Sequence, residues 1–230
     1  THGIAPQAVT QGALVLARSV PYMPVGIHLA VVDPGVGGDR RAVAIRTAGG
    51  RVYIGPDNGL LSLAAPAATV EGARALTNAR FHLDPVSRTF HARDIFAPAA
   101  AHLANGVAIE ELGRALEPGS LVRIAVPAPE LGRTQIGATV LSVDRFGNVA
   151  TNVRREHIEA LGLADGDRVE IRLTFDRYFA VVAGAFADAP PGELLLYEDS
   201  YGLVTLAISR GNAARLTGVS SGDEVRIART

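Results

Sequence analysis

The pattern of apolar residues changes near residue 126, and this change constrains the possible folds more than any other feature. Before it, segments with helical spacing alternate with short apolar runs, as in domains that place helices between strands. The sequence VPAP at 126–129 is typical of a linker, and short strand-like segments dominate after it. We therefore expect an α/β domain over residues 1–126 and a smaller, mostly β, barrel-like domain over residues 130–230.

Local patterns place individual elements within these domains. The first domain is expected to contain helices over residues 6–20, 58–65 and 94–104, a strand over 27–32 that suits burial on both faces, and a hairpin of 42–46 and 52–55. The second is expected to contain strands over residues 135–143, 168–173, 193–197, 203–208 and 224–227, and one helix over 155–161. Within these elements, His28 and His102 are expected to be packing residues.

Composition excludes several classes of function. The formal net charge is −1 and no basic stripe stands out, so we expect no nucleic-acid partner. There is no cysteine, which excludes disulfides and thiolate sites and fits a cytoplasmic location. No apolar run approaches the roughly 20 residues that span a bilayer, so no membrane partner is expected. We also find no Walker motif, no G-x-S-x-G elbow and no convincing metal-ligand spacing.

Two segments of the first domain combine polar residues with tight turns. Asp33 follows the expected strand 27–32 and opens the loop DPGVGG, and Arg40 comes one loop later, where it could pair with Asp33. A structural turn with an ion pair is the simpler interpretation. His91 lies in TFHARDIFAP (residues 89–98), just before an expected helix. Here the simpler interpretation makes Asp94 a helix cap and His91 an ordinary loop residue.

Two further segments lie in the second domain. DRFGNVATN at 144–152 runs from a strand into a polar turn, which by itself indicates Asx hydrogen bonds. EDSYG at 198–202 and SRGNAA at 209–214 are compatible with two hairpin turns and a helix N-cap. Each of the four segments is a weak signal when it is taken alone.

Taken in order, these segments resemble a known family. The matching sequences are THGI (1–4), LAVVDPGVG (29–37), IGPDNGLL (54–61), TFHARDIFAP (89–98), FGNVATN (146–152) and RGNAA (210–214). The chain resembles the S-adenosyl-L-methionine (SAM) hydroxide adenosyltransferases, which are adenosine-forming SAM hydrolases related to fluorinases and chlorinases. The resemblance implies an α/β domain joined to a β-rich domain, and a homotrimer with active sites between subunits.

The resemblance also implies roles for particular residues. Asp33, Arg40 and His91 match the set with which the hydrolases activate water. The halogenases carry other residues at the Asp and His positions, including a Tyr where Asp33 stands, so the expected reaction is attack of water on the ribose 5′ carbon of SAM. The products would be adenosine and L-methionine, with SAM as substrate and no cofactor or metal.

Substrate-binding residues follow from the same resemblance. Asp144 would lie near the methionine ammonium group and Ser200 near its carboxylate. Tyr201 stands where the halogenases have Arg. Asn148 and the backbone around Asn212 and Ala213 would bind adenine.

One feature departs from the family pattern. Family members begin with a strand that carries a ribose-binding Asp, upstream of the segment that matches residues 1–4, and the expected first domain lacks this strand. Two alternatives therefore stay open beside the hydrolase: a SAM-dependent halogenase, and an inactive trimer that binds SAM or adenosine. The Asp33, Arg40 and His91 set favours the hydrolase.

Overall fold

The computed structural model describes residues 3–230, so the first two residues of the THGI segment lie outside the described part. The chain divides into two compact units, one ending at Ala125 and the other beginning at Val126. Within residues 3–230, no helix is both long and apolar enough to cross a membrane.

The first unit contains a five-stranded mixed sheet in the order β1-β3-β2-β4-β5. β1 runs parallel to β3, and the other neighbouring strands are antiparallel. Mixed strands with covering helices confirm the expected α/β class. The strands are β1 (Ile27–Leu29), β2 (Ala42–Thr47), β3 (Val52–Pro56), β4 (Val70–Ala75) and β5 (Ala115–Leu116).

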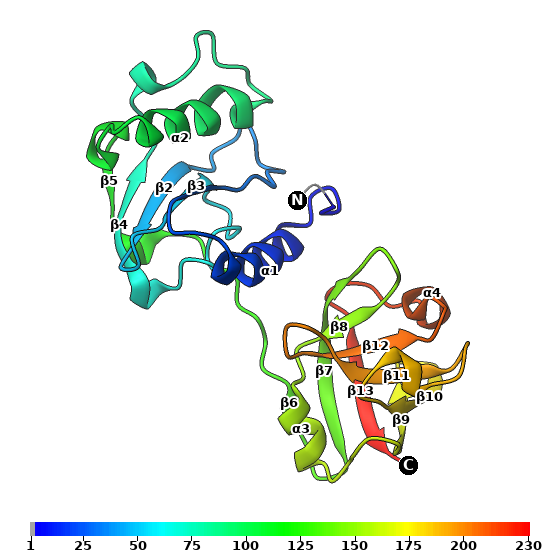
Figure 1. The fold of residues 1–230 in the computed structure, drawn as a ribbon. Coiled ribbons are helices and arrows are strands. Elements are labelled where there is room, and N and C mark those ends of the chain that lie inside the picture. The colour runs from blue at the N-terminus through cyan, green and yellow to red at the C-terminus, as the bar shows by residue number, and fades with distance from the viewer. Residues whose placement is uncertain (1–2) are drawn as a thin grey trace. The chain divides into compact units, whose positions relative to one another are not determined.

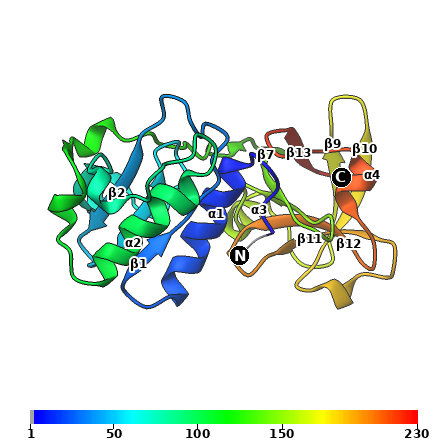
Figure 2. The ribbon, with the colours of Figure 1, turned by 90° about the horizontal axis from the view of Figure 1, so that it is seen from above.

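Helices cover both faces of this sheet, with α2 on one side and α1 on the other (Figure 1), and Figure 2 gives the same elements seen from above. Side chains alternate along a strand, so Val43 and Ile45 of β2 belong to one hydrophobic cluster and Ala44 to another. The first cluster packs against α1 (Val9–Ser19) and the second against α2 (Ala97–Ala104). The result is a three-layer arrangement with the sheet in the middle.

Short helical turns connect these elements. A π-helical turn, η4 (Ala92–Phe96), leads directly into α2, so the helix predicted over 94–104 begins two residues earlier and in a different geometry. The other turns are 3₁₀: η1 (Val20–Tyr22), η2 (Ala67–Thr69), η3 (Ala79–Phe81), η5 (Ile109–Leu112), η6 (Pro118–Ser120) and, in the second unit, η7 (Phe186–Asp188).

Two expectations for the first unit are wrong. The strand predicted over 27–32 is regular only at Ile27–Leu29 and is not buried on both faces, because β1 is the edge strand of the described sheet and leaves Leu29 44% exposed. The helix predicted over 58–65 is a series of turns. Gly59 there has a positive φ of 96°, which does not fit a right-handed helix.

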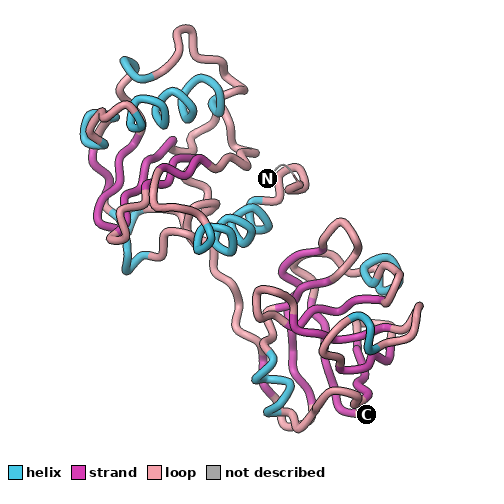
Figure 3. Tube along the Cα trace, in the orientation of Figure 1, coloured by secondary structure: helices cyan, strands magenta, loops and turns pink. Residues whose placement is uncertain are grey.

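The second unit is a β-barrel, in agreement with the expected barrel-like domain. Seven strands follow the order β13-β9-β10-β11-β12-β8-β7, and β13 also pairs with β7, which closes the ring. Strands, drawn in magenta in Figure 3, dominate this unit. They are β6 (Glu130–Leu131), which pairs with β7 outside the ring, β7 (Gln135–Val143), β8 (Val149–Thr151), β9 (Arg168–Arg172), β10 (Arg177–Val182), β11 (Leu194–Glu198), β12 (Val204–Ile208) and β13 (Glu224–Arg229).

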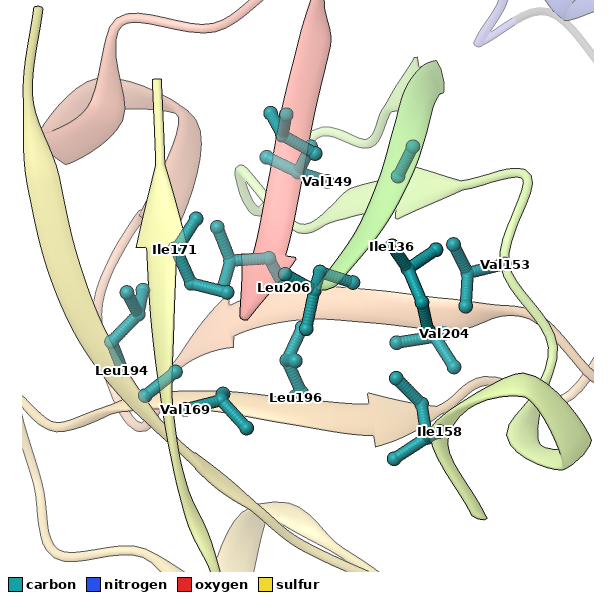
Figure 4. Packing of buried hydrophobic residues seen from close by; sticks show 14 of the residues in the cluster. Ile136, Val149, Val153, Ile158, Val169, Ile171, Leu194, Leu196, Val204 and Leu206 are labelled. Carbon is teal, nitrogen blue, oxygen red and sulfur yellow. The ribbon is translucent and has the colours of Figure 1, made fainter. Parts of the chain in front are cut away.

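Alternating apolar residues fill the barrel. Ile136, Ala138 and Val140 of β7 are buried, with the intervening residues partly exposed. Figure 4 shows Ile136, Leu196 and other side chains gathered in the interior. Two short helices, α3 (Arg155–Ala160) and α4 (Ala213–Thr217), complete the unit, and α3 adds Ile158 to the barrel core.

Candidate active site

The loop after β1 folds back so that the side chain of Arg40 forms an ion pair with Asp33. Nε of Arg40 lies 2.9 Å from Oδ1 and 3.0 Å from Oδ2 of Asp33, and Nη2 lies 2.5 Å from Oδ2. Only 10% of the Arg40 side chain and 6% of the Asp33 side chain are exposed. Two parallel N–H···O contacts between ionised groups make this pair strong and directional.

The same guanidinium group reaches His91, the third residue of the expected set. Nη2 of Arg40 lies 2.8 Å from Nδ1 of His91. Because an arginine N–H can only donate, Nδ1 is the acceptor, and the neutral ring then carries its proton on Nε2. The structure therefore brings Asp33, Arg40 and His91 into one hydrogen-bonded group. It also leaves the Nε2–H of His91, on the opposite side of the ring, as a hydrogen-bond donor.

Gly37 allows the two segments of this group to approach one another. Its φ is +77°, and a Cβ there would stand 2.3 Å from the backbone oxygen of Arg88. Only glycine tolerates both the conformation and the contact. The loop carrying Asp33 and Arg40 thus lies against the backbone that precedes His91.

Asn58, in the turn that follows β3, supports the group and was not singled out as a site residue from the sequence. Its side-chain nitrogen donates to the carbonyl oxygen of Val32 at 2.9 Å, and its oxygen accepts from the amide of Leu60 at 3.1 Å. Because Val32 precedes Asp33, this bond fixes the start of the site loop. A tight turn with an Asn is too common a sequence signal to have found it.

The segment around His91 differs from the simpler interpretation of the sequence. His91, not Asp94, occupies the N-cap position of η4. Asp94 is buried, and its carboxylate accepts from the amide of Ser87 at 2.7 Å and from the guanidinium of Arg93 at 2.5 Å. These hydrogen bonds hold the pKa of Asp94 below its usual value. The carboxylate thus ties the loop before His91 to the helical turn after it.

Two further side chains lie close to this group. Phe96 has no exposed surface, and its ring centroid lies 5.2 Å from Cζ of Arg40. His82 is half-buried, and burial lowers its pKa. Neither residue has a local sequence signal that points to the site, because both depend on tertiary proximity.

The second unit contains a cavity of about 1080 Å³. Asp144 and Asn148 both line it and bind each other: Nδ2 of Asn148 lies 2.8 Å from Oδ2 of Asp144. The other Asp144 oxygen accepts from the amides of Phe146 and Asn148, as expected for an Asx turn. The remaining lining residues are Phe146, Phe186, Ile208, Arg210, Gly211, Asn212, Arg215 and Leu216.

Asn212 and Gly147 join two walls of this cavity. The side-chain oxygen of Asn212 accepts from the amide of Arg215 and caps α4, as the sequence indicated. Gly147 has a φ of +85°, and a Cβ there would stand 2.1 Å from the Asn212 side chain. The backbone oxygen of Gly147 also accepts from the amide of Ala214 at 2.9 Å.

The other expected binding residues are placed less directly. Ala213 is fully buried at the start of α4. Ser200 and Tyr201 are exposed on the turn between β11 and β12, and neither is among the residues that line the cavity. Tyr197 was not expected: burial, and then the charges of Asp199 and Asp144, raise the pKa of its phenol, so its ring lies near an acidic part of this unit.

The two units thus supply different chemistry. The first holds a carboxylate, a guanidinium and a neutral imidazole in fixed contact, and such groups can orient a water molecule and accept a proton. The second offers a cavity lined by apolar groups, one carboxylate, two amides and two guanidinium groups, which suits an organic ligand of mixed polarity. No group of three His, Cys, Asp or Glu side chains among residues 3–230 is arranged to hold a metal ion.

Comparison with known proteins connects this chemistry to a family. Residues 1–113 match the SAM hydroxide adenosyltransferase N-terminal domain, and residues 138–226 match the corresponding C-terminal domain. An (R)-S-adenosyl-L-methionine hydrolase of Salinispora arenicola is 46% identical over 99% of this chain and 84% of its own length. A protein of the same name from Thermus thermophilus is 38% identical over 98% of this chain and 85% of its own length.

A more distant relative and a solved structure also match this chain along its whole length. A fluorinase of Actinopolyspora mzabensis is 26% identical over 100% of this chain and 86% of its own length. The crystal structure of an uncharacterized conserved protein from Thermotoga maritima superposes with a TM-score of 0.88 at 35% identity, covering 100% of this chain and 87% of that one. Family matches in both units, together with a relative 46% identical along almost the whole chain, lead to one conclusion: the chain belongs to the SAM hydroxide adenosyltransferase family.

Proposed function

We propose that this protein hydrolyses SAM to adenosine and L-methionine by attack of water on the ribose 5′ carbon. The observation that carries the proposal is the contact of Arg40 with both Asp33 and His91, at 2.5 Å and 2.8 Å. Relatives along the full chain that are named (R)-SAM hydrolases support the same reaction. A fluorinase is a more distant relative, at 26% identity.

The chemistry needs little more than a positioned water molecule. The water oxygen forms a bond to the 5′ carbon as the bond from that carbon to sulfur breaks, and the bonding electrons go to sulfur. The sulfonium becomes the neutral thioether of methionine, which is why methionine is a good leaving group. When a water molecule is held in line with the breaking bond, most of the acceleration of its attack comes from this orientation. The proton that it loses must pass to a group of the enzyme.

We assign proton acceptance to Asp33. Its carboxylate oxygens have lone pairs beyond those that accept from Arg40. His91 has Nδ1 engaged by Arg40, so its Nε2–H acts as a donor that orients the water oxygen or the developing hydroxyl group. Arg40 holds the carboxylate in place through its hydrogen bonds while the proton moves.

The second unit would bind the substrate. Asp144 carries a charge that suits the methionine ammonium group, and Asn148 and the backbone near Asn212 and Ala213 suit the adenine edge. Ser200 is assigned to the methionine carboxylate and Tyr201 to its surroundings. In the SAM complex, Asp144 would exchange part of its bonding with Asn148 for contact with the ligand.

We further propose that the protein acts as a homotrimer in which each site combines the first unit of one subunit with the second unit of its neighbour. The proposal rests on the family resemblance and on the division of the proposed residues between two units. A sharp test mixes Asp33→Ala and Asp144→Ala subunits after mild dissociation. Sites between subunits would regain activity on mixing, whereas sites within one subunit would not.

The direct test is product analysis. Purified protein is incubated with SAM, with chloride or fluoride added in parallel, and nucleosides are separated by chromatography. Adenosine and methionine in equal amounts, independent of halide, are the expected result. A halogenated nucleoside would instead place the protein with the halogenases, and bound but unreacted SAM would identify a binding protein.

The absence of cysteine also supports a cytoplasmic location, which cell fractionation would test.

A further inference from the structure

The Arg40 guanidinium lies over an aromatic ring. Cζ of Arg40 lies 5.2 Å from the ring centroid of Phe96, whose exposed fraction is zero. Phe96 belongs to the hydrophobic cluster that also holds Ile54 and Leu112, so the ring cannot move away without disturbing the core. A cation over an aromatic face is attracted by the ring quadrupole, and the attraction grows when water is excluded.

The π-helical turn explains how one short segment supplies two contacts to Arg40. His91 caps η4 and Phe96 ends it, and the amide of Ala97 donates to the carbonyl of Ala92, five residues back. An α-helix turns about 100° per residue, so positions five apart would point about 140° away from each other. The wider π-turn reduces this divergence, and such turns occur often at functional sites. Here it lets the His91 ring and the Phe96 ring both reach Arg40.

We propose that Phe96 is a positioning residue of the hydrolysis, which fixes the plane of the Arg40 guanidinium so that Nη2 serves Asp33 and His91 together. This inference rests on the proposed function. Three hydrogen-bond contacts already tie Arg40 to the Asp33 carboxylate, but a single contact ties it to His91. If the guanidinium tilts, the hydrogen bond to His91 is therefore lost first. The role of Phe96 is thus to keep the His91 proton on Nε2.

The test changes the charge distribution of the ring without changing its shape. Phenylalanine analogues with increasing numbers of ring fluorines are placed at position 96 of the full-length protein. Fluorination weakens the negative ring face, so kcat is expected to fall stepwise, by about tenfold over the series, while the Kd of SAM stays constant. Equal turnover across the series would overturn the positioning role.

A matched pair of variants separates positioning from core packing. Phe96→Leu removes the ring face, whereas Leu112→Ala damages the same hydrophobic cluster, and Leu112 is not among the residues in contact with Arg40. Both are expected to lower the melting temperature, but only Phe96→Leu should lower kcat strongly. A loss of kcat that simply follows the melting temperature in both variants would contradict the proposal.

A second readout does not depend on turnover. The ¹⁵N chemical shifts of the His91 ring report which nitrogen carries the proton, and they are expected to move toward a mixture of tautomers in Phe96→Leu and to stay fixed in Leu112→Ala. If the unmodified protein forms no adenosine, the proposed function fails, and these shifts still decide the positioning role. Unchanged shifts in Phe96→Leu would overturn it.

Discussion

Nη2 of Arg40 lies 2.8 Å from Nδ1 of His91, although 51 positions separate the two residues in the chain. The contact joins the loop after β1 to the turn before α2, two segments on either side of strands β2, β3 and β4 in sequence. Since arginine only donates, the contact also sets the tautomer of the histidine. One hydrogen bond therefore links the fold of the first unit to the protonation state of its proposed site.

Replacing Asp33 tests the assigned proton acceptor. Asp33→Ala is expected to lower kcat by at least about 100-fold, the usual contribution of a positioned acid or base, while SAM binding remains measurable. Turnover is followed by adenosine release and binding by calorimetry. Asp39→Ala, which removes an exposed carboxylate from the same loop, serves as the control and should retain activity. Unchanged turnover in Asp33→Ala would exclude its role in activating water.

Asn58 is expected to act on the reaction through the backbone. Asn58→Asp keeps an oxygen for the Leu60 amide but loses the N–H that donates to the carbonyl of Val32. With the start of the Asp33 loop released, kcat should fall while the Kd of SAM changes little, and stability should drop by about 1 kcal/mol. Steady-state kinetics and thermal unfolding measure the two effects. A variant with normal kcat would show that the Asp33 loop holds its position without this bond.

Gly147 offers a matched pair for the cavity of the second unit. Gly147→Ala combines a positive φ of 85° with a clash against Asn212, whereas Gly166→Ala has a similar φ of 92° and nothing within 4 Å of the added Cβ. Both should lose about 1–2 kcal/mol from backbone strain. Only Gly147→Ala should also weaken SAM binding, because its loop must shift. Equal SAM affinities in the two variants would argue against adenine binding at this wall.

Stability should fall in mild acid because of two partly buried histidines. Burial, reinforced by the charge of Arg51, lowers the pKa of His28, and burial also lowers that of His82. Between the lowered folded pKa and the unfolded value of about 6.5, the unfolded chain binds more protons. The free energy of unfolding should therefore decrease as the pH falls below about 6.5, and level off below the folded pKa.

The variant His28→Leu isolates part of this effect. Nε2 of His28 makes no hydrogen bond within the described residues, and the ring stacks on Tyr53, so an apolar replacement breaks no polar contact. Melting temperatures measured from about pH 8 to pH 5 should fall less in this variant than in the unmodified protein. Parallel curves would show that His28 does not contribute.

Elements with strong internal periodicity were predictable from the sequence. The strand over 135–143 matches β7, and the helix over 6–20 contains α1 (Val9–Ser19), because alternation and helical spacing indicate a buried face directly. The strand β4 (Val70–Ala75) was missed, since its sequence VEGARA has little alternation and depends on pairing with β2. β10 (Arg177–Val182) was missed as well and is held between β9 and β11.

The proposed site was predictable only in part. The pairing of Arg40 with Asp33 could be anticipated from their closeness in one glycine-rich loop. The contact with His91 could be expected only from the family resemblance, because no local pattern reports a neighbour 51 residues away. Asn58 and Phe96 were not anticipated as site residues. Asn58 acts through a bond to a backbone carbonyl and Phe96 through its ring face, and neither kind of contact has a distinctive sequence signal.

The closure of the barrel by β13 has a consequence for how the second unit would fail. β13 pairs with β7 on one side and with β9 on the other, so it is the strand that closes the ring. A protein truncated before Glu224 would expose the edges of β7 and β9 together with the apolar interior of the barrel. Such a species would aggregate through edge-to-edge pairing, so nascent chains would be vulnerable until β13 itself had emerged from the ribosome.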